Sequence, residues 1–286
     1  MRRPSVAILV VCALTVASAP RVRGLERQSA PRTAARYAAP VFASVDVKQD
    51  VVFSQVKSAT GPAKDLTLDV YQPSGDAATI RPAILWIHGG GFKPGTDKRQ
   101  KYIVTMATEF AKRGYVSVAP DYRLRQDPKA DAMGTLRDAV ADCRAALAWL
   151  RANREVYRVD PGRIVVAGGS AGGKTAVSLV IVENAEARTG QARPIVALVD
   201  LWGSPEASLM LGEIDSRFPP TVIVHGTKDE SVPFALSEAL AGTLKANGID
   251  YVLKPIPDAP HTPIDHMAEI LETTSTFLAR VLNRAP

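Results

Sequence analysis

Cysteine is almost absent from this 286-residue chain, which contains only Cys12 and Cys143. Cys12 lies in an N-terminal segment that we expect to be removed, so the mature protein has one cysteine and forms no intramolecular disulfide. Apolar residues recur at helical spacing over residues 136–150, and we therefore expect Cys143 to be a packed helix residue. The fold must then depend on its hydrophobic core.

Long hydrophobic runs are also lacking. The longest, over residues 6–17, is shorter than the roughly 20 residues that a membrane-spanning helix needs. Arg2 and Arg3 precede this run, and small residues follow it at 17–19, which is the layout of a secretory signal peptide. We therefore predict a signal peptide over residues 1–19, export to the periplasm or the medium, and no membrane span. The sequence leaves the cleavage site open.

A net positive charge is lacking from most of the chain, although the formal net charge of the whole is +6. Residues 1–37 contain seven arginines against the single acid Glu26, so this segment accounts for the whole excess. A nucleic-acid-binding domain would place its basic residues on a folded face, and we predict no nucleic-acid partner. We divide the remainder into a basic leader over 20–45 and one catalytic domain over 46–286.

Short apolar runs alternate with helical patterns through that domain. We predict strands at 47–56, 66–71, 83–88, 115–119, 164–167, 195–201, 221–225 and 251–255. We predict helices at 101–113, 137–153, 171–183, 236–247 and 264–283. The first two strands are typical of a half-exposed edge hairpin, and the near-continuous apolar strands indicate a parallel sheet buried on both faces. This order predicts an α/β fold built from βαβ units.

A glycine-rich turn follows the strand predicted at 164–167. Gly168-Gly169-Ser170-Ala171-Gly172 fits the pattern Gly-x-Ser-x-Gly in a strand-turn-helix context, which presents a serine nucleophile at a helix N-terminus. A phosphate-binding loop is the alternative for such a turn, and Lys174 does follow it. The spacing of that motif is not met, so we favour Ser170 as a nucleophile.

A serine nucleophile needs a base, and the chain has only four histidines. His88 and His225 each end a predicted strand before glycine, and we interpret both as structural or loop-organising. His261 lies in a proline-rich loop between the last strand and the last helix, where it can point into a site. His266 lies within the last helix. We therefore favour His261 as the general base over His266.

The base in turn needs an acid to orient it. Asp229 closely follows the strand at 221–225 and fits the chain order of serine, then acid, then histidine. Glu230 and Asp258 compete with it for this role. Gly89-Gly90-Gly91, after the strand at 83–88, offers backbone N–H groups that could join that of Ala171 around a developing oxyanion.

These motifs resemble the α/β-hydrolase superfamily and, within it, the hormone-sensitive-lipase-like carboxylesterases and related secreted esterases. The resemblance extends from about Val47 to the C-terminus and is carried by the segments 88–92, 121–124, 169–173, 225–229 and 232–233 and by His261. It implies a mostly parallel eight-stranded sheet with helices on both faces. By position, Gly90, Gly91 and Ala171 would form the oxyanion hole, and segment 121–124 would pack beneath the site.

The chain departs from the lipase-like pattern at two points. Gly169 precedes the serine where many members have an acidic residue, and the usual cap region, between 201 and 221, is short. Both features resemble compact feruloyl- and acetyl-esterase-like proteins and imply a minimal cap. Whether the leader forms a lid over the site is left open by the sequence.

The implied reaction is hydrolysis of short-chain or aryl carboxylic esters through an acyl-serine intermediate. The ester could be a small molecule or a group on a polysaccharide, and the oligomeric state is not indicated. We expect no cofactor and no metal, since the sequence has no histidine- or cysteine-rich cluster. The alternatives are a serine peptidase of the prolyl-oligopeptidase type and a non-catalytic ligand-binding homologue.

Overall fold

The computed structural model describes residues 36–56, 63–190, 195–205 and 211–284. The predicted signal peptide and most of the predicted leader lie outside these residues. The strands are β1 (Val45–Val56), β2 (Lys64–Pro73), β3 (Arg81–Ile87), β4 (Val116–Pro120), β5 (Val159–Gly169), β6 (Ala197–Leu201), β7 (Thr221–Gly226) and β8 (Tyr251–Ile256). The α-helices are α1 (Lys101–Lys112), α2 (Ala132–Ala152), α3 (Arg154–Tyr157), α4 (Ala171–Arg188), α6 (Phe234–Ala246) and α7 (Met267–Arg284).

All the strands pair into one eight-stranded sheet in the order β1-β2-β4-β3-β5-β6-β7-β8. β1 pairs antiparallel with β2, and β2 antiparallel with β4, whereas every later pair is parallel. The mostly parallel sheet and its antiparallel edge hairpin are therefore confirmed. β1 is largely exposed along its length, as expected of an edge strand.

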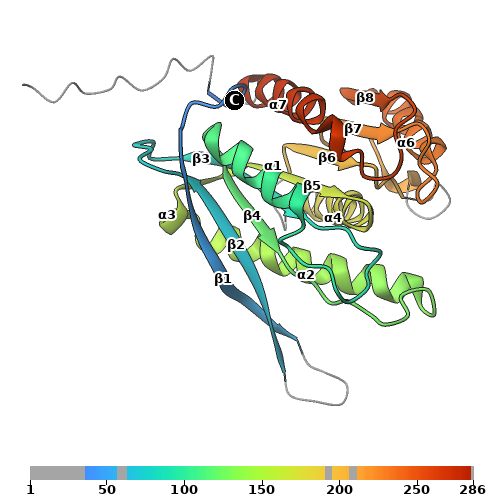
Figure 1. The fold of residues 1–286 in the computed structure, drawn as a ribbon, viewed down its shortest axis with the longest axis horizontal. Coiled ribbons are helices and arrows are strands. Elements are labelled where there is room, and N and C mark those ends of the chain that lie inside the picture. The colour runs from blue at the N-terminus through green and yellow to red at the C-terminus, as the bar shows by residue number, and fades with distance from the viewer. Residues whose placement is uncertain (1–35, 57–62, 191–194, 206–210, 285–286) are drawn as a thin grey trace, which may run out of the picture. The chain divides into compact units, whose positions relative to one another are not determined.

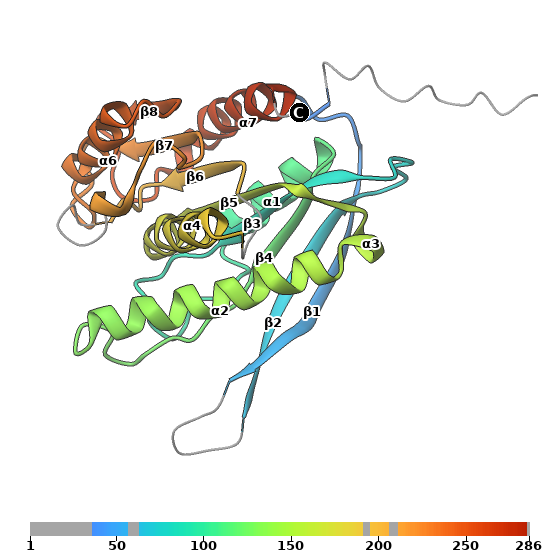
Figure 2. The same cartoon turned by 180° about the vertical axis from the view of Figure 1, so that it is seen from behind.

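Helices cover both faces of this sheet (Figures 1 and 2). Helices α1 and α7 pack on one face, where Trp86 of β3 contacts the apolar side chains of α1. Helices α2, α4 and α6 pack on the other face. Because side chains alternate along a strand, neighbouring residues of β3 such as Leu85 and Trp86 enter different cores. This explains why the central strands are apolar over most of their length.

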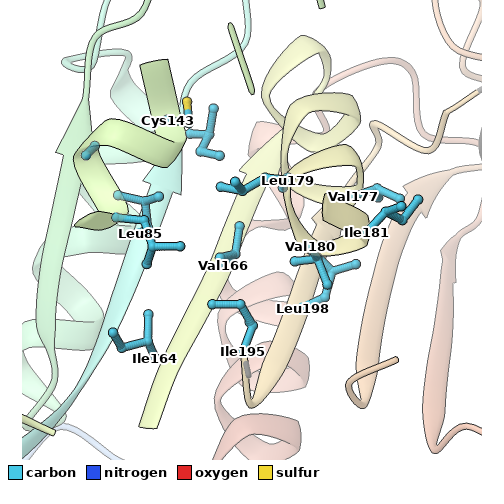
Figure 3. Close-up of a cluster of buried hydrophobic side chains, with 14 of the residues drawn as sticks. Leu85, Cys143, Ile164, Val166, Val177, Leu179, Val180, Ile181, Ile195 and Leu198 are labelled. Carbon is cyan, nitrogen blue, oxygen red and sulfur yellow. The ribbon is translucent and has the colours of Figure 1, made fainter. Parts of the chain in front are cut away.

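The core on the α2 and α4 side contains Cys143, as predicted for a packed helix residue. Figure 3 shows it near Leu85, Leu179 and Val166, which come from β3, α4 and β5. The thiol is fully buried, and burial raises its pKa well above the usual range. Cys143 is therefore a core residue with no free access to solvent.

The structure differs from several of the sequence-based boundaries: β5 begins at Val159 and α4 ends at Arg188, each five residues beyond its predicted limit. Helix α2 begins five residues earlier than predicted, because the Asp131 carboxylate accepts a hydrogen bond from the Gly134 N–H and caps the helix there. The short helix α3 was not predicted. It ends at Tyr157 and is followed by Arg158, whose φ of 54° places it in the left-handed region.

The last residues of the predicted leader pack against the domain. The Tyr37 N–H donates to the Arg113 carbonyl, and Arg36 forms an ion pair with Asp76, which also pairs with the buried Arg81. Part of the basic charge of the leader therefore has a structural partner.

The active-site candidates gather where the strand order reverses. β4 lies on one side of β3 and β5 lies on the other, so the chain leaves β3 and β5 in opposite directions. In parallel α/β sheets, such a reversal opens a crevice at the carboxyl ends of the strands. No helix in the part of the chain described by the structure is long and apolar enough to cross a bilayer.

Candidate active site

Ser170 occupies a sharp turn between β5 and α4. Its φ of 58° and ψ of −123° are unfavourable for a residue with a side chain, and such strain is typical of functional sites. The turn closes only because its neighbours are glycines. A Cβ on Gly172 would lie 2.1 Å from the Ile87 carbonyl oxygen, and one on Gly168 would lie 2.2 Å from the Gly172 carbonyl oxygen. The serine is therefore held at the N-terminus of α4.

His261 lies beside this serine. Its Nε2 is 2.8 Å from the Ser170 Oγ, and its Nδ1 is 2.6 Å from the Asp229 Oδ2. The ring comes from the loop between β8 and α7, and its side chain is 23% exposed, so it faces the crevice. A carboxylate at Nδ1 requires a proton on that nitrogen and leaves Nε2 to accept the serine proton.

Asp229 lies at the start of the loop after β7, with its side chain fully buried. Burial alone would raise its pKa, but hydrogen bonds from the Val232 amide, His261 and the Ser231 amide outweigh this effect and lower the pKa. The two amides donate to Oδ1 at 2.8 Å each. Asp229 therefore stays ionised and faces the imidazole with its other oxygen.

Gly90 and Gly91 lie on the loop after β3 and line the same cavity as Ser170 and Ala171. Both have positive φ, at 102° and 62°, and neither amide donates a hydrogen bond within the described part of the chain. The Gly89 amide, in contrast, already donates to the Tyr102 hydroxyl. The two glycines predicted for the oxyanion hole thus keep their N–H groups available next to the nucleophile.

Tyr102 is a site residue that the sequence analysis missed. Its hydroxyl accepts from the Gly89 N–H at 2.8 Å and donates to the Gly169 carbonyl at 3.3 Å, so it ties the glycine loop to the nucleophile turn. It lies in the first turn of α1 and is buried against Trp202. An isolated tyrosine in an amphipathic helix carries no motif that would reveal this role.

The competing residues lie elsewhere. Asp258 is exposed and pairs with Lys228, and His266 faces Glu269 at 3.5 Å. Glu230 is exposed. The structure therefore brings Ser170, His261 and Asp229 together and leaves these alternatives outside.

The remaining histidines are buried near the site. His88 stacks on Tyr122, whose hydroxyl donates to the His88 carbonyl at 2.8 Å. This contact places the segment 121–124 beneath the glycine loop, as the resemblance implied. His225 contacts Asp229 directly, with 2.9 Å between its Nε2 and the carboxylate Oδ2.

A cavity of about 710 Å³ opens at Ser170. Lys93, Lys129 and Lys174 line it, together with Phe92 and Val232, and none of the aspartates and glutamates that the structure describes does. The described residues contain no group of three or more histidine, cysteine, aspartate or glutamate side chains that could hold a metal ion. The arrangement provides an activated hydroxyl, a base with its acid, and free amides, which together suit acyl transfer.

Comparison with known families gives two matches. The sequence model of the BD-FAE family matches residues 68–212, which include Ser170, Gly90 and Gly91. The model of the prolyl oligopeptidase family matches residues 206–285, which include Asp229 and His261.

Known proteins of similar sequence and structure are esterases and lipases. Lipase 2 of Moraxella sp. (strain TA144) is 32% identical over 46% of this chain and 29% of its own length. The probable carboxylic ester hydrolase LipM of Mycobacterium tuberculosis is 24% identical over 62% of this chain. The chain spans less than half the length of either protein, 29% and 48% respectively.

A solved structure covers the chain more fully. Esterase 2 of Thermogutta terrifontis with propionate bound has a TM-score of 0.69 and 28% sequence identity, and the match covers 86% of this chain and 98% of that one. The same esterase is also known phosphorylated by paraoxon, again with a TM-score of 0.69.

Proposed function

Since this chain belongs to the BD-FAE family and has the α/β-hydrolase fold, we propose that it is a serine carboxylic-ester hydrolase. The observation that carries this proposal is the continuous contact from Ser170 Oγ through His261 to Asp229, at 2.8 and 2.6 Å. The free amides of Gly90 and Gly91 and the N–H of Ala171 complete the site. We assign the nucleophile, base and acid roles to the three side chains and the oxyanion hole to the three amides.

The reaction proceeds in two steps. Ser170 Oγ attacks the ester carbonyl while His261 Nε2 takes its proton, and the oxyanion forms against the Gly90, Gly91 and Ala171 amides. Collapse of this intermediate releases the alcohol, which receives that proton, and leaves an acyl-Ser170. His261 then deprotonates a water, which cleaves the acyl-enzyme to the carboxylic acid and restores the serine hydroxyl.

Hydrolysis of p-nitrophenyl butyrate by the wild type and by Ser170→Ala tests the proposal. The variant should lose at least about 10³-fold in kcat, because it lacks the hydroxyl that lies against His261 and forms the acyl intermediate. Ser231→Ala, at another residue lining the cavity, is the matched control and should keep most of the activity. An inactive wild type would favour the non-catalytic homologue, and an active Ser170→Ala variant would refute the assigned nucleophile.

Short acyl chains fit this proposal best. The Thermogutta esterase has been solved with propionate and with butyrate bound, and the cavity here is open at Ser170. A panel of acetyl, butyryl, octanoyl and feruloyl esters should therefore rank the butyryl and acetyl esters above the octanoyl ester. The same panel, extended to an acetylated polysaccharide, tests whether the ester group is carried by a polymer.

The charge of the cavity points to an anionic ester. Lys129 and Lys174 line it, as does Lys93, and none of the three forms an ion pair within the described residues. One added charge pair at a separation of about 4 Å contributes about 1 kcal/mol where water screens it fully, as in an open cavity, and this is roughly a fivefold preference. Substrates with a carboxylate on the acyl or alcohol part should thus bind better than their neutral analogues.

A matched substrate pair tests this preference. After correction for alkaline hydrolysis rates, 4-acetoxybenzoate should show a kcat/KM about fivefold above that of 4-acetoxybenzamide at low salt. The difference should shrink at 0.5 M NaCl and in Lys129→Gln. Equal values for the two esters at low salt would contradict an anionic substrate while leaving the esterase assignment intact.

Peptidase activity is the second candidate, because the prolyl oligopeptidase model matches residues 206–285. That match covers the acid and the base but not Ser170. A comparison of proline p-nitroanilide with p-nitrophenyl butyrate separates the two activities. We expect measurable turnover of the ester alone, whereas faster cleavage of the anilide would favour the peptidase.

We further propose that the protein is exported, on the basis of the sequence pattern at 1–19. Expression of the full chain in a bacterial host, followed by cell fractionation and intact-mass measurement, tests this proposal. The exported form should have lost about 19 residues. A cytoplasmic protein of full mass would contradict export.

A further inference from the structure

A line of buried polar side chains runs from behind the triad into the sheet. His225 Nδ1 lies 2.6 Å from the Ser237 Oγ, and Ser237 Oγ lies 2.8 Å from the Ser204 Oγ. Ser204 Oγ in turn lies 2.5 Å from the Asp200 Oδ2. The four residues come from β6, the loop after it, β7 and α6, and all are fully buried. The reaction described above uses none of them.

The two acceptors beside the His225 ring determine which of its nitrogens carries the proton. Its Nε2 faces the Asp229 Oδ2 at 2.9 Å and the Val232 carbonyl oxygen at 3.0 Å, and both are acceptors. Nε2 must therefore carry a hydrogen. Burial lowers the pKa of His225, which keeps the ring neutral and leaves Nδ1 as an acceptor. Ser237 then has to donate its hydroxyl proton to Nδ1.

Counting protons along the line leads to Asp200. Once Ser237 donates to His225, its oxygen can only accept from Ser204, because each hydroxyl has one proton. Ser204 then has no proton left for Asp200. Four contacts therefore need four protons, whereas the two hydroxyls and the neutral imidazole supply three. The fourth belongs on the carboxyl of Asp200, which then donates to Ser204.

The surroundings of Asp200 favour this protonated form. Its Oδ1 is buried and accepts no hydrogen bond of normal geometry from the residues that the structure describes. Burial raises its pKa to about 6 despite opposing contributions from Ser204, the Gly203 amide and the charge of Lys174 on α4. The stretch of β5 beside Asp200 has only apolar residues and glycine, and the β7 residue paired with Asp200 is Ile223. The titratable group on β7 is His225, which reaches Asp200 only through Ser237 and Ser204.

We propose that Asp200, Ser204, Ser237 and His225 form a relay that holds one extra proton behind the triad and positions the Asp229 carboxylate for catalysis. The relay ends on the Asp229 Oδ2, the oxygen that also accepts from His261. With the fourth proton present, each of the four contacts has its own proton, and the His225 N–H stays directed at the Asp229 Oδ2. Without it, Ser204 turns to Asp200, and the Ser237 hydroxyl is shared between Ser204 and His225.

The relay residues are positioning residues, because none of them lines the cavity. The proposal rests on the proposed esterase function, and it predicts effects on kcat and on pH dependence with little effect on KM. Asp200→Asn keeps a permanent N–H donor for Ser204 and so mimics the protonated relay. Ser237→Ala removes the donor to His225 and cuts the relay in the middle.

The test compares kcat and KM for an ester substrate between pH 5 and pH 8.5. For Asp200→Asn, the ratio of its kcat to that of the wild type should rise from about one at pH 5 to about three at pH 8, as Asp200 ionises in the wild type. Ser237→Ala should lower kcat about tenfold with KM within about twofold. In a Ser237→Ala background, Asp200→Asn should change neither kcat nor its pH dependence, because both residues act on His225 through the same chain of hydrogen bonds.

Two controls separate the relay from general effects on folding. Ser275→Ala also removes a buried hydroxyl from a helix, α7, and should leave kcat unchanged. Asp46→Asn removes an exposed carboxylate on β1 and should leave the pH profile unchanged. A constant ratio for Asp200→Asn across the pH range would overturn the relay, whereas loss of the esterase function itself would appear as an inactive wild type.

A measurement without turnover gives a second readout. With four histidines in the chain, ¹⁵N labelling of histidine gives few imidazole signals, and the His225→Gln variant assigns the one of interest. His225 should show a protonated Nε2 and an accepting Nδ1 from pH 5 to pH 8. A proton on Nδ1, as the neutral tautomer or as imidazolium, would place the fourth proton elsewhere and contradict the proposal. This readout remains available if Ser237→Ala does not fold.

Discussion

The buried carboxyl of Asp200 should make the stability of this protein depend on pH in a way that Asp200→Asn removes. The pKa of this group is raised from 3.8 to about 6 by burial. The folded protein therefore retains a proton that the unfolded chain releases above pH 3.8. Its contribution to stability is fully present below pH 3.8 and is lost as the pH rises through about 6.

The size of this loss follows from the shift. About two pKa units at 1.36 kcal/mol each give about 3 kcal/mol between pH 3 and pH 8, and about half of this falls between pH 5 and pH 8. Asparagine has nearly the same shape, does not titrate, and still donates to Ser204. The free energy of unfolding of Asp200→Asn should therefore rise relative to the wild type by about 1.5 kcal/mol from pH 5 to pH 8.

Urea unfolding at pH 5, 6, 7 and 8 measures this difference directly. All other groups titrate alike in the two proteins, so their contributions cancel when the curves are subtracted. Asp46→Asn, an exposed carboxylate on the edge strand, should run parallel to the wild type and serves as the control. If the wild type and Asp200→Asn also run parallel between pH 5 and pH 8, Asp200 ionises as an ordinary carboxyl and the reasoning is wrong.

Other residues give further predictions. Asp229→Asn should lower kcat for p-nitrophenyl butyrate by about 10³- to 10⁴-fold at nearly constant KM, because the amide cannot hold the His261 tautomer; a loss below tenfold would contradict its role. Tyr102→Phe should lower kcat about tenfold, since it unties the glycine loop from the nucleophile turn, and full activity would show that this link is dispensable. Gly172→Ala should lower the free energy of unfolding in urea by about 3 kcal/mol or more, because its Cβ would meet the Ile87 carbonyl. Gly242→Ala, on the exposed face of α6, should raise it by about 0.5–1 kcal/mol, because alanine favours a helix over glycine and the Cβ meets no atom there.

Local patterns in the sequence were enough to predict the fold. The central strands are short and mostly apolar because both faces of the sheet are covered, whereas the helices are longer and repeat their apolar residues at helical spacing. Length and periodicity therefore distinguish strands from helices. The N-terminus of α2 was harder to predict, because it depends on one capping hydrogen bond from the Gly134 N–H to the Asp131 carboxylate. The glycines around Ser170 mark the turn because no other residue fits there.

The contacts around that turn were less accessible from sequence. Tyr102 and the relay residues meet only after distant segments pack together, and single serines or aspartates carry no pattern that reveals a buried partner. His225 was interpreted as loop-organising from its position before Gly226, and it does contact the loop at Asp229 and Val232. Its connection through Ser237 to Asp200 depends on the packing of α6 beside β6 and β7.

Labelling with paraoxon tests the central assignment most directly. An organophosphate reacts with an activated serine hydroxyl, and a structural relative of this chain has been solved phosphorylated by paraoxon. The wild type should gain one diethylphosphoryl group, located by mass spectrometry on the peptide that contains Ser170, and lose its esterase activity in proportion. An adduct at another residue, or full inhibition of Ser170→Ala by the same reagent, would contradict the account.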